Sequence, residues 1–319
     1  MEKGLSWMPS CSVVIRAYNE AKHIGRLLEG LSRQTIHASE IILVDSGSTD
    51  STPDQAAAAG AKVIHIRPEE FTFGRSLNLG LASASAALAV IASAHVYPVY
   101  PDWLERLLEP FSDPQMALTY GKQRAPASAH FSEQQVYQRW YPESSEPSQA
   151  QPFCNNANAA VRLSVWKAHP YDETLTGLED LAWARWVLDE HHRIAYVAEA
   201  EIVHVHTETL PGVYNRYRRE GMAFKRIYPE AHFNLYDFVR MASANIASDV
   251  WHARKQPHFV RNLPGIFWYR TAQFWGTYMG YRQSLEWSWN LRQTFYYPHG
   301  LKMPDEPLIR KVEPIQYKG

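Results

Sequence analysis

Short apolar runs and amphipathic stretches alternate along the first hundred residues of the chain. The apolar runs are rich in β-branched residues and span residues 12–15, 41–44 and 63–66, which predicts buried strands. Between the first two runs, apolar residues recur at i, i+3, i+4 and i+7 from Ile24 to Leu31, as is typical of one helix face. Strands that alternate with helices in this way predict an α/β fold with a parallel sheet and right-handed crossovers.

The second helix carries its own boundary signals. We expect Asp50 to be its N-cap, Pro53 to lie in its first turn and Gly60 to end it. Residues 76–101 then contain no charged side chain, yet they are rich in Ala and Ser and are interrupted by polar residues and prolines. A spanning helix needs about 20 strongly apolar residues, so we expect a helix followed by a buried strand here and no transmembrane segment.

Charged and aromatic residues are unevenly distributed over the 319 residues. The net charge is −1, but residues 1–210 have a balance of −9 and residues 211–319 one of +8, together with 22 of the 41 aromatic residues. A basic, aromatic region on an acidic body indicates contact with an anionic surface such as a membrane. The alternative is a helical subdomain whose aromatic residues form its own core, and the sequence favours neither.

Cysteine usage and the first residues of the chain indicate the compartment. Cys11 and Cys154 are too few for a disulfide framework, and the sequence contains no Cys/His finger. Residues 1–10 also lack the apolar core of a secretion signal. We therefore expect a reducing, cytoplasmic setting, and no nucleic-acid partner.

Chemistry is expected in the loops after the first two strands, because ligands of open parallel sheets bind outside the carboxyl ends of the strands. The first loop reads Arg16-Ala17-Tyr18-Asn19-Glu20 and the second Asp45-Ser46-Gly47-Ser48-Thr49-Asp50. Asp45 suits the imide of a pyrimidine or the hydroxyls of a ribose, and Tyr18 offers a face on which a base can stack. Neither loop has the Gly-rich signature of a dinucleotide or Walker site.

In this order, the two loops resemble those of family 2 glycosyltransferases, which have the GT-A fold. Further segments resemble the bacterial rhamnosyltransferase branch of that family: residues 73–80, residues 120–123, residues 155–160 followed by Trp166, residues 179–180 followed by Trp183, and residues 204–206 ahead of a Tyr/Arg-rich helix. The resemblance implies a Rossmann-like, mostly parallel sheet flanked by helices over residues 8–210. An α-helical C-terminal region is expected over residues 211–300 and an extended, proline-containing tail over residues 301–319.

The resemblance also implies roles for individual residues. The residues expected on the side of the nucleotide-sugar donor are Arg16, Tyr18, Glu20, Asp45, Ser48, Arg75, Asn78, His95 and Arg124, and those on the acceptor side are Asn156, Asn158 and Trp183. Asp180, beside Glu179 at the start of a helix, is expected to be the base that takes the proton of the acceptor hydroxyl. A single base without a second carboxylate as nucleophile implies inversion. Without the resemblance, both carboxylates are explained more simply as helix-capping residues.

One departure from the family concerns the D-x-D type motif, which holds a divalent cation on the donor diphosphate. At that place the chain reads Ser93-Ala94-His95, and no carboxylate lies between Glu70 and Asp102. The resemblance implies Mg²⁺ or Mn²⁺ as a cofactor, whereas the missing carboxylate argues for weaker metal dependence. We expect His95 to occupy the vacant position.

Two more histidines are candidates for the same role. His204 and His206 are i and i+2 in an expected strand, so both point to one face, where they could form a metal pair or a diphosphate clamp. With His95 they are the candidate metal ligands. The next helix carries five basic residues, of which most are expected on a solvated face and a few within reach of a diphosphate: Arg216, Arg218, Arg219, Lys225 and Arg226.

These features predict a hexosyl- or deoxyhexosyltransferase that moves a sugar from a dTDP- or UDP-linked donor to a glycan or lipid-linked acceptor. We expect it to act in bacterial surface polysaccharide or glycolipid synthesis, in the cytoplasm or peripherally at the inner face of the cytoplasmic membrane. One alternative is a non-catalytic or scaffolding protein that has lost its metal site, although it would not need to retain Glu179 and Asp180. A nucleotidyltransferase, the second alternative, would need a Gly-rich signature near the first strand, which is absent.

Overall fold

An eight-stranded sheet forms the centre of the computed structural model, which describes residues 10–206 and 209–283. The strands follow the order β3-β2-β1-β4-β7-β6-β8-β5. They are β1 (Cys11–Ala17), β2 (Glu40–Asp45), β3 (Lys62–His65), β4 (Leu88–Ser93), β5 (Val96–Pro98), β6 (Met116–Arg124), β7 (Asn158–Arg162) and β8 (Arg193–His204). β1, β2, β3 and β4 pair in parallel, as predicted, whereas β7 runs antiparallel to both β4 and β6, so the sheet as a whole is mixed.

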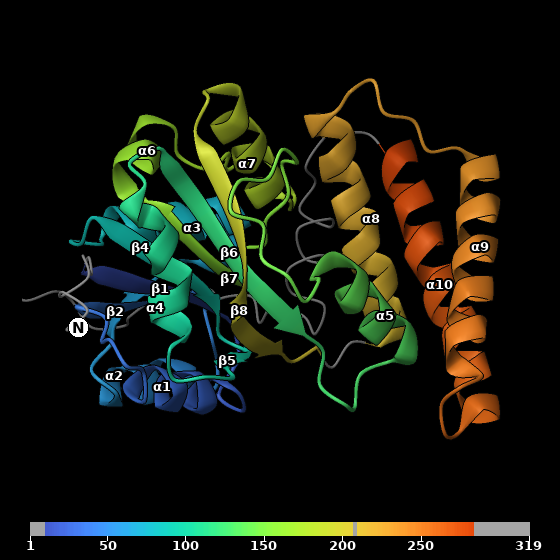
Figure 1. Cartoon of the computed structure of the whole chain (residues 1–319), viewed down its shortest axis with the longest axis horizontal. Helices are drawn as coiled ribbons and strands as arrows, with labels where there is room; N and C mark the ends of the chain where they lie inside the picture. The colour runs from blue at the N-terminus through green and yellow to red at the C-terminus, as the bar shows by residue number, and fades with distance from the viewer. Residues whose placement is uncertain (1–9, 207–208, 284–319) are drawn as a thin grey trace, which may run out of the picture. The chain divides into compact units, whose positions relative to one another are not determined.

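Helices cover both faces of this sheet (Figure 1). They are α1 (Ile24–Ser32), α2 (Thr52–Ala58), α3 (Phe73–Ala82), α4 (Trp103–Leu108), α5 (Phe131–Trp140), α6 (Leu163–Ala168) and α7 (Glu179–Asp189), with 3₁₀ turns at Pro68–Glu70 and Glu109–Ser112. Val13 and Ile15 of β1 belong to the core that contains α1 and α4, and Val14 belongs to the core that contains α3 and α7. Because both faces of β1 are buried, its sequence is a continuous apolar run.

Three long helices follow the sheet: α8 (Leu210–Ile227), α9 (Leu235–Ala253) and α10 (Phe259–Arg282), which confirms the predicted helical character of this region (Figure 1). α10 approaches α8 so closely that a Cβ atom on Gly276 would lie 2.5 Å from the carbonyl oxygen of Tyr214. Only glycine permits this contact. Within the described ranges, no helix combines the length and apolarity needed to cross a membrane.

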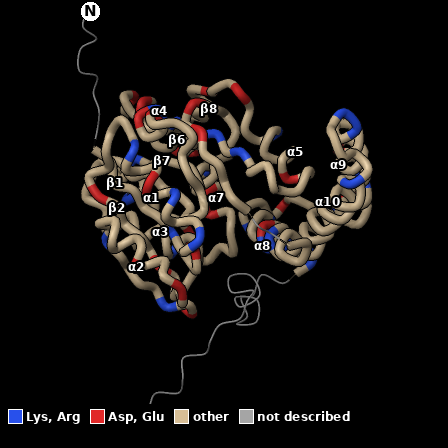
Figure 2. Tube along the Cα trace, turned by 90° about the horizontal axis from the view of Figure 1, so that it is seen from below, with Lys and Arg blue, Asp and Glu red and all other residues tan. Residues whose placement is uncertain are grey.

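The aromatic residues of these helices divide into two groups. Tyr217 and Tyr269 are buried with Val213 in a small core of their own, whereas Trp251 and Trp268 are more than half exposed. α10 carries three arginines and no acidic residue, whereas α9 carries one arginine and two aspartates (Figure 2). The buried group fits the interpretation of a helical subdomain with its own core, whereas contact with an anionic surface stays a prediction.

Three local boundaries differ from the sequence-based expectations. The N-cap of α2 is Ser51, and Asp50 instead accepts hydrogen bonds from the backbone N–H groups of Ala21 and Thr52, at 3.0 Å each, which ties the first two loops together. β3 ends at His65, one residue early, and β8 ends at His204, so His206 lies beyond the strand. The predicted tail over residues 301–319 lies outside the described residues.

Candidate active site

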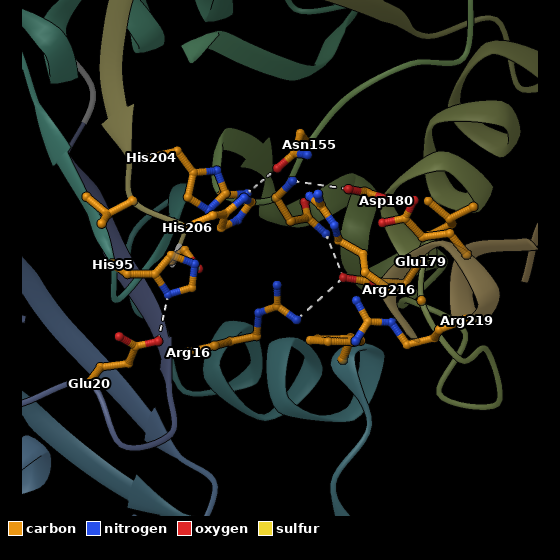
Figure 3. A pocket seen from close by; sticks show the side chains of 18 of the residues that line it. Arg16, Glu20, His95, Asn155, Glu179, Asp180, His204, His206, Arg216 and Arg219 are labelled. Atoms are coloured by element: carbon orange, nitrogen blue, oxygen red, sulfur yellow. Dashed lines mark hydrogen bonds and ion pairs between the residues drawn. The ribbon is translucent and has the colours of Figure 1, made fainter. Parts of the chain in front are cut away.

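A pocket of about 410 Å³ opens where the carboxyl ends of β1, β4 and β8 meet the first turn of α7 and one face of α8. Figure 3 shows His95, His204 and His206 on one side of this pocket and Glu179 and Asp180 on the other. The pocket therefore lies at the sheet edge where parallel strands are expected to bind ligands.

Half of the predicted site residues line this pocket. They are Arg16, Glu20, His95, Asn156, Glu179, Asp180, His204 and His206. The other half lie outside its lining: Tyr18, Asp45, Ser48, Arg75, Asn78, Arg124, Asn158 and Trp183. For the second group, direct contact with a substrate stays a prediction.

The two adjacent carboxylates begin α7, directly after Leu178, whose backbone has a positive φ of 56°. The carboxylate of Asp180 accepts hydrogen bonds from the backbone N–H of Leu181 at 2.8 Å and of Asn156 at 3.2 Å. Nη1 of Arg16 lies 3.6 Å from the carboxylate of Glu179. The bond from Leu181 is a capping contact, but the Asn156 and Arg16 contacts aim both carboxylates at the pocket.

The environment of Asp180 changes its acidity. Burial raises the pKa of this carboxyl to about 7, and the neighbouring charge of Glu179 adds to the rise. The two backbone hydrogen bonds and the charge of Arg16 act in the opposite direction and lower the pKa. A carboxyl with a pKa near neutrality can take up a proton and release it again near physiological pH. Asp180 therefore has the acidity of a general base.

The three histidines form one cluster. One ring nitrogen of each lies within 4.8 Å of a ring nitrogen of the other two. The rings of His95 and His204 are stacked, with centroids 5.0 Å apart. Burial holds the pKa values of His204 and His206 well below the usual range. Nearby His206 lowers the pKa of His204 further, and nearby Arg216 lowers the pKa of His206 further. Both rings are therefore neutral near pH 7.

The predicted nucleotide loops after β1 and β2 are joined to each other. The carboxylate of Asp45 is buried and accepts hydrogen bonds from the backbone N–H of Gly47 at 3.3 Å and of Ser48 at 3.2 Å. Oγ of Ser48 in turn accepts the backbone N–H of Asn19 at 2.8 Å. Gly47 has a φ of +88°, which glycine adopts without strain. Asp45 therefore shapes the loop that follows it.

Several other predicted residues hold the scaffold together. The amide of Asn78 bonds Tyr171, Trp166 and Glu173, and Arg75 forms an ion pair with Glu173 at 3.3 Å. Asn158 is fully buried between β6 and β8, where its side chain donates hydrogen bonds to the carbonyl oxygens of Lys122 and Ala200. Trp183 is buried and donates to the carbonyl of His169, and Arg124 lies 3.2 Å from Glu201.

Two arginines of α8 complete the pocket. Arg216 and Arg219 are three positions apart, so they lie on one helix face, and both line the pocket. The guanidinium groups of Arg219 and Arg16 lie 4.7 and 4.8 Å from the centre of the Phe73 ring. The sequence pointed to this basic helix without separating these two residues from its other cations, and it did not point to His23, which also lines the pocket.

Comparisons with known proteins identify the family. The model described as Glycosyl transferase family 2 matches residues 12–164. The O-antigen chain rhamnosyltransferase WbaN of Salmonella anatum is 28% identical over 227 residues, which are 67% of this chain and 72% of WbaN. The O-antigen chain rhamnosyltransferase RfbN of Salmonella typhimurium is 27% identical over 225 residues, which are 66% of this chain and 71% of RfbN.

Solved structures show a similar fold. The mannosyltransferase PcManGT of Pyrobaculum calidifontis, in complex with GDP-Man and Mn²⁺, has a TM-score of 0.58 at 18% identity and covers 84% of this chain and 85% of its own. S. aureus TarS in complex with UDP-GlcNAc has a TM-score of 0.52 at 15% identity, with coverages of 83% and 90%. These likenesses confirm the predicted GT-A fold. Residues 12–164 match glycosyl transferase family 2, as the sequence motifs predict, and the sequence of the chain is similar to O-antigen chain rhamnosyltransferases.

Proposed function

We propose that this protein is an inverting glycosyltransferase that uses a nucleoside-diphosphate sugar and has Asp180 as its catalytic base. The observation that carries the proposal is the Asp180 carboxyl in the pocket, whose pKa is raised to about 7. Cationic side chains line the same pocket and suit an anionic diphosphate. A base and a leaving-group site in one pocket are what glycosyl transfer requires.

In the proposed reaction, an oxygen of the Asp180 carboxylate takes the proton of the acceptor hydroxyl. The acceptor oxygen forms a bond to the anomeric carbon while the bond from that carbon to the diphosphate oxygen breaks. The bonding electron pair stays on the leaving diphosphate, whose charge Arg16, Arg216 and Arg219 stabilise. A single displacement of this kind inverts the anomeric configuration.

The three histidines fit a divalent cation as well. His204 Nε2 is buried and has no hydrogen-bond partner among the described residues, so it is available as a ligand. A cation held by His95, His204 and His206 would supply positive charge against the leaving diphosphate. In the structural neighbours, PcManGT was obtained with Mn²⁺ and a nucleotide sugar, which supports the same use here.

The substrates follow from the same comparison. WbaN and RfbN are named as O-antigen chain rhamnosyltransferases, so we propose a deoxyhexosyl or hexosyl donor linked to dTDP or UDP and a glycan or lipid-linked acceptor of a bacterial surface polysaccharide. Asp45 and Tyr18 serve the nucleotide, and Asn156 serves the acceptor side. We propose that the protein works in the cytoplasm, with α9 and α10 against the anionic inner face of the membrane.

The Asp180→Asn variant tests the base directly. It keeps the size and polarity of the side chain but removes the proton acceptor, so transfer should fall by about 10²–10⁴-fold. Binding of the nucleotide sugar, measured by calorimetry, should stay nearly unchanged. The matched control is Asp189→Asn, at the exposed far end of the same helix, which should transfer like the parent. Full transfer by Asp180→Asn would contradict the assignment of the base, whereas no transfer by the parent with any nucleotide sugar would favour a scaffolding protein.

A further inference from the structure

The three pocket histidines are oriented by a second set of buried or partly buried side chains. Nδ1 of His204 lies 2.8 Å from Oε1 of Gln123, and Nδ1 of His206 lies 2.9 Å from Oε1 of Glu133. Nδ1 of His95 lies 2.7 Å from Oε1 of Glu20. The three partners come from β6, α5 and the loop after β1, so three independent elements converge on the cluster.

These contacts define the state of each imidazole. An amide oxygen and an ionised carboxylate accept hydrogen bonds, so in the tautomer that satisfies all three contacts each Nδ1 atom carries the hydrogen and donates it. A neutral imidazole with its hydrogen on Nδ1 has a lone pair on Nε2. The remaining nitrogen of each ring therefore has a lone pair that can serve as a ligand, although that of His95 also lies 3.4 Å from Oγ of Ser93.

Nε2 of His204 is the nitrogen whose environment indicates a missing ligand. Nε2 of His204 is buried and has no hydrogen bond to any residue that the structure describes, whereas most buried polar atoms have one. A cation between the three rings would satisfy it, since one ring nitrogen of each histidine lies within 4.8 Å of those of the other two. Histidines that bind metals almost always donate their second ring nitrogen to a carboxylate, a carbonyl or water, which is the arrangement seen here.

We propose that His95, His204 and His206 form a three-nitrogen site selective for transition metals such as Mn²⁺, Co²⁺ or Zn²⁺ over Mg²⁺, and that Gln123, Glu133 and Glu20 are its positioning residues. The proposal deepens the proposed function, because it states which metal class serves that site. Imidazole suits transition metals, while Mg²⁺ prefers oxygen ligands. With Ser93-Ala94-His95 in place of the usual carboxylates, the site thus loses its preference for Mg²⁺ and keeps the transition metals.

The first experiment measures metal binding to the EDTA-treated, dialysed full chain without donor or acceptor. Co²⁺, followed by its visible absorption, should bind once per chain and be displaced by Mn²⁺ or Zn²⁺ but not by an excess of Mg²⁺. His204→Ala and His95→Ala should each weaken Co²⁺ binding by at least about tenfold. His23→Ala, which removes another histidine of the same pocket, should not. Equal competition by Mg²⁺, or parental affinity in His204→Ala, would overturn the proposal.

The second experiment tests the positioning residues. Gln123→Leu should lower Co²⁺ affinity by about 10–100-fold, and Gln123→Glu, which keeps an acceptor oxygen, should restore it. If circular dichroism shows that Gln123→Leu does not fold, Glu20→Ala and Glu20→Gln at the partly exposed rim provide the same pair of variants. Folded Leu or Ala variants that bind Co²⁺ like the parent would refute the positioning role.

The two proposals can fail separately. Asp180→Asn should keep the Co²⁺ affinity of the parent, because Asp180 lies on the opposite side of the pocket (Figure 3). Transfer by that variant would reject the base and leave the metal site intact. Loss of Co²⁺ selectivity with normal dependence on Asp180 would reject the metal site and leave the base intact.

Discussion

Buried charges are paired with opposite charges in the C-terminal helices, whereas two like charges lie side by side in the pocket. In the helices, Arg270 is 3% exposed and meets the 1% exposed carboxylate of Asp249 through two hydrogen bonds of 2.7 and 2.9 Å, with Gln273 as a further partner. In the pocket, two carboxylates stand side by side at Glu179 and Asp180. The helices satisfy this buried pair internally, whereas the pocket places two like charges side by side and leaves Nε2 of His204 without a hydrogen bond from the described residues, so that a substrate or cation can satisfy it.

The largest effect is expected from breaking the satisfied pair. Asp249→Asn keeps the shape of the side chain but leaves the Arg270 guanidinium buried without a counter-charge, which should cost about 3–5 kcal/mol of the free energy of unfolding. The melting temperature should fall by about 10 °C, since about 1 kcal/mol corresponds to about 2–4 °C at this size. The exposed pair of Arg240 and Asp237 provides the control, because Arg240→Gln should cost under about 1 kcal/mol. Equal losses in both variants would contradict the comparison.

The same Asp-to-Asn change at Asp180 in the pocket should raise the free energy of unfolding at high pH. The folded-state pKa of Asp180 is raised from 3.8 to about 7, so the stability that its protonated form contributes is present below pH 4 and lost as the pH rises to about 7. Asn does not ionise. Asp180→Asn should therefore melt a few degrees higher than the parent at pH 8 and about equally at pH 4. A lower melting temperature of the variant at pH 8 would show that the charged carboxylate stabilises the fold.

A smaller effect is expected at the nucleotide loops. Asp45→Ala removes the acceptor of two backbone N–H groups and should weaken nucleotide binding by about tenfold, or about 1.4 kcal/mol. Tyr18→Ala should weaken it less, because the half-buried Tyr18 ring is expected to contact the base through one face only, while the Asp45 carboxylate also holds the loop. Calorimetry with UDP and dTDP measures both. If neither variant changes the affinity, the donor does not use these strand ends.

The smallest effect is expected at the outer surface of α9 and α10. Trp268 is 56% exposed and lies seven positions after Arg261, on the same helix face. Flotation with anionic vesicles should show weak, salt-sensitive binding, with about 1 kcal/mol lost per basic residue removed. Trp268→Ser and Arg261→Gln should reduce vesicle binding. Tyr100→Ser, which removes an exposed aromatic side chain just after β5, should not. No flotation at low salt would contradict the membrane contact.

The sequence predicted those parts of the molecule that depend on local patterns. Apolar runs and i, i+3, i+4 spacing were enough for the parallel strands and their helices, and adjacent residues were enough to pair Glu179 with Asp180. Gln123 and Glu133 could not be predicted in this way. They are 81 and 73 positions from the histidines they contact, and only the folded sheet brings β6 and α5 to the end of β8.

Asn78 shows a second limit of prediction from sequence, in which a motif identifies a residue without specifying its role. Its motif suggested contact with the donor, which stays a prediction, and in the structure its amide oxygen accepts hydrogen bonds from Trp166 and from the backbone of Tyr171. A motif records that a residue type is needed at a position, and it does not distinguish a ligand contact from a scaffold contact. The distinction depends on long-range hydrogen bonds that local spacing does not encode.

The most direct test of the account is the pH dependence of sugar transfer by the full chain. Because Asp180 must be deprotonated to act as a base and its pKa is raised to about 7, kcat/KM should be level above about pH 8 and fall about tenfold per unit below about pH 6. The residual activity of Asp180→Asn should lack this dependence. A parental profile that stays level from about pH 5 to pH 8, or the same fall in Asp180→Asn, would contradict the assignment of Asp180 as the base.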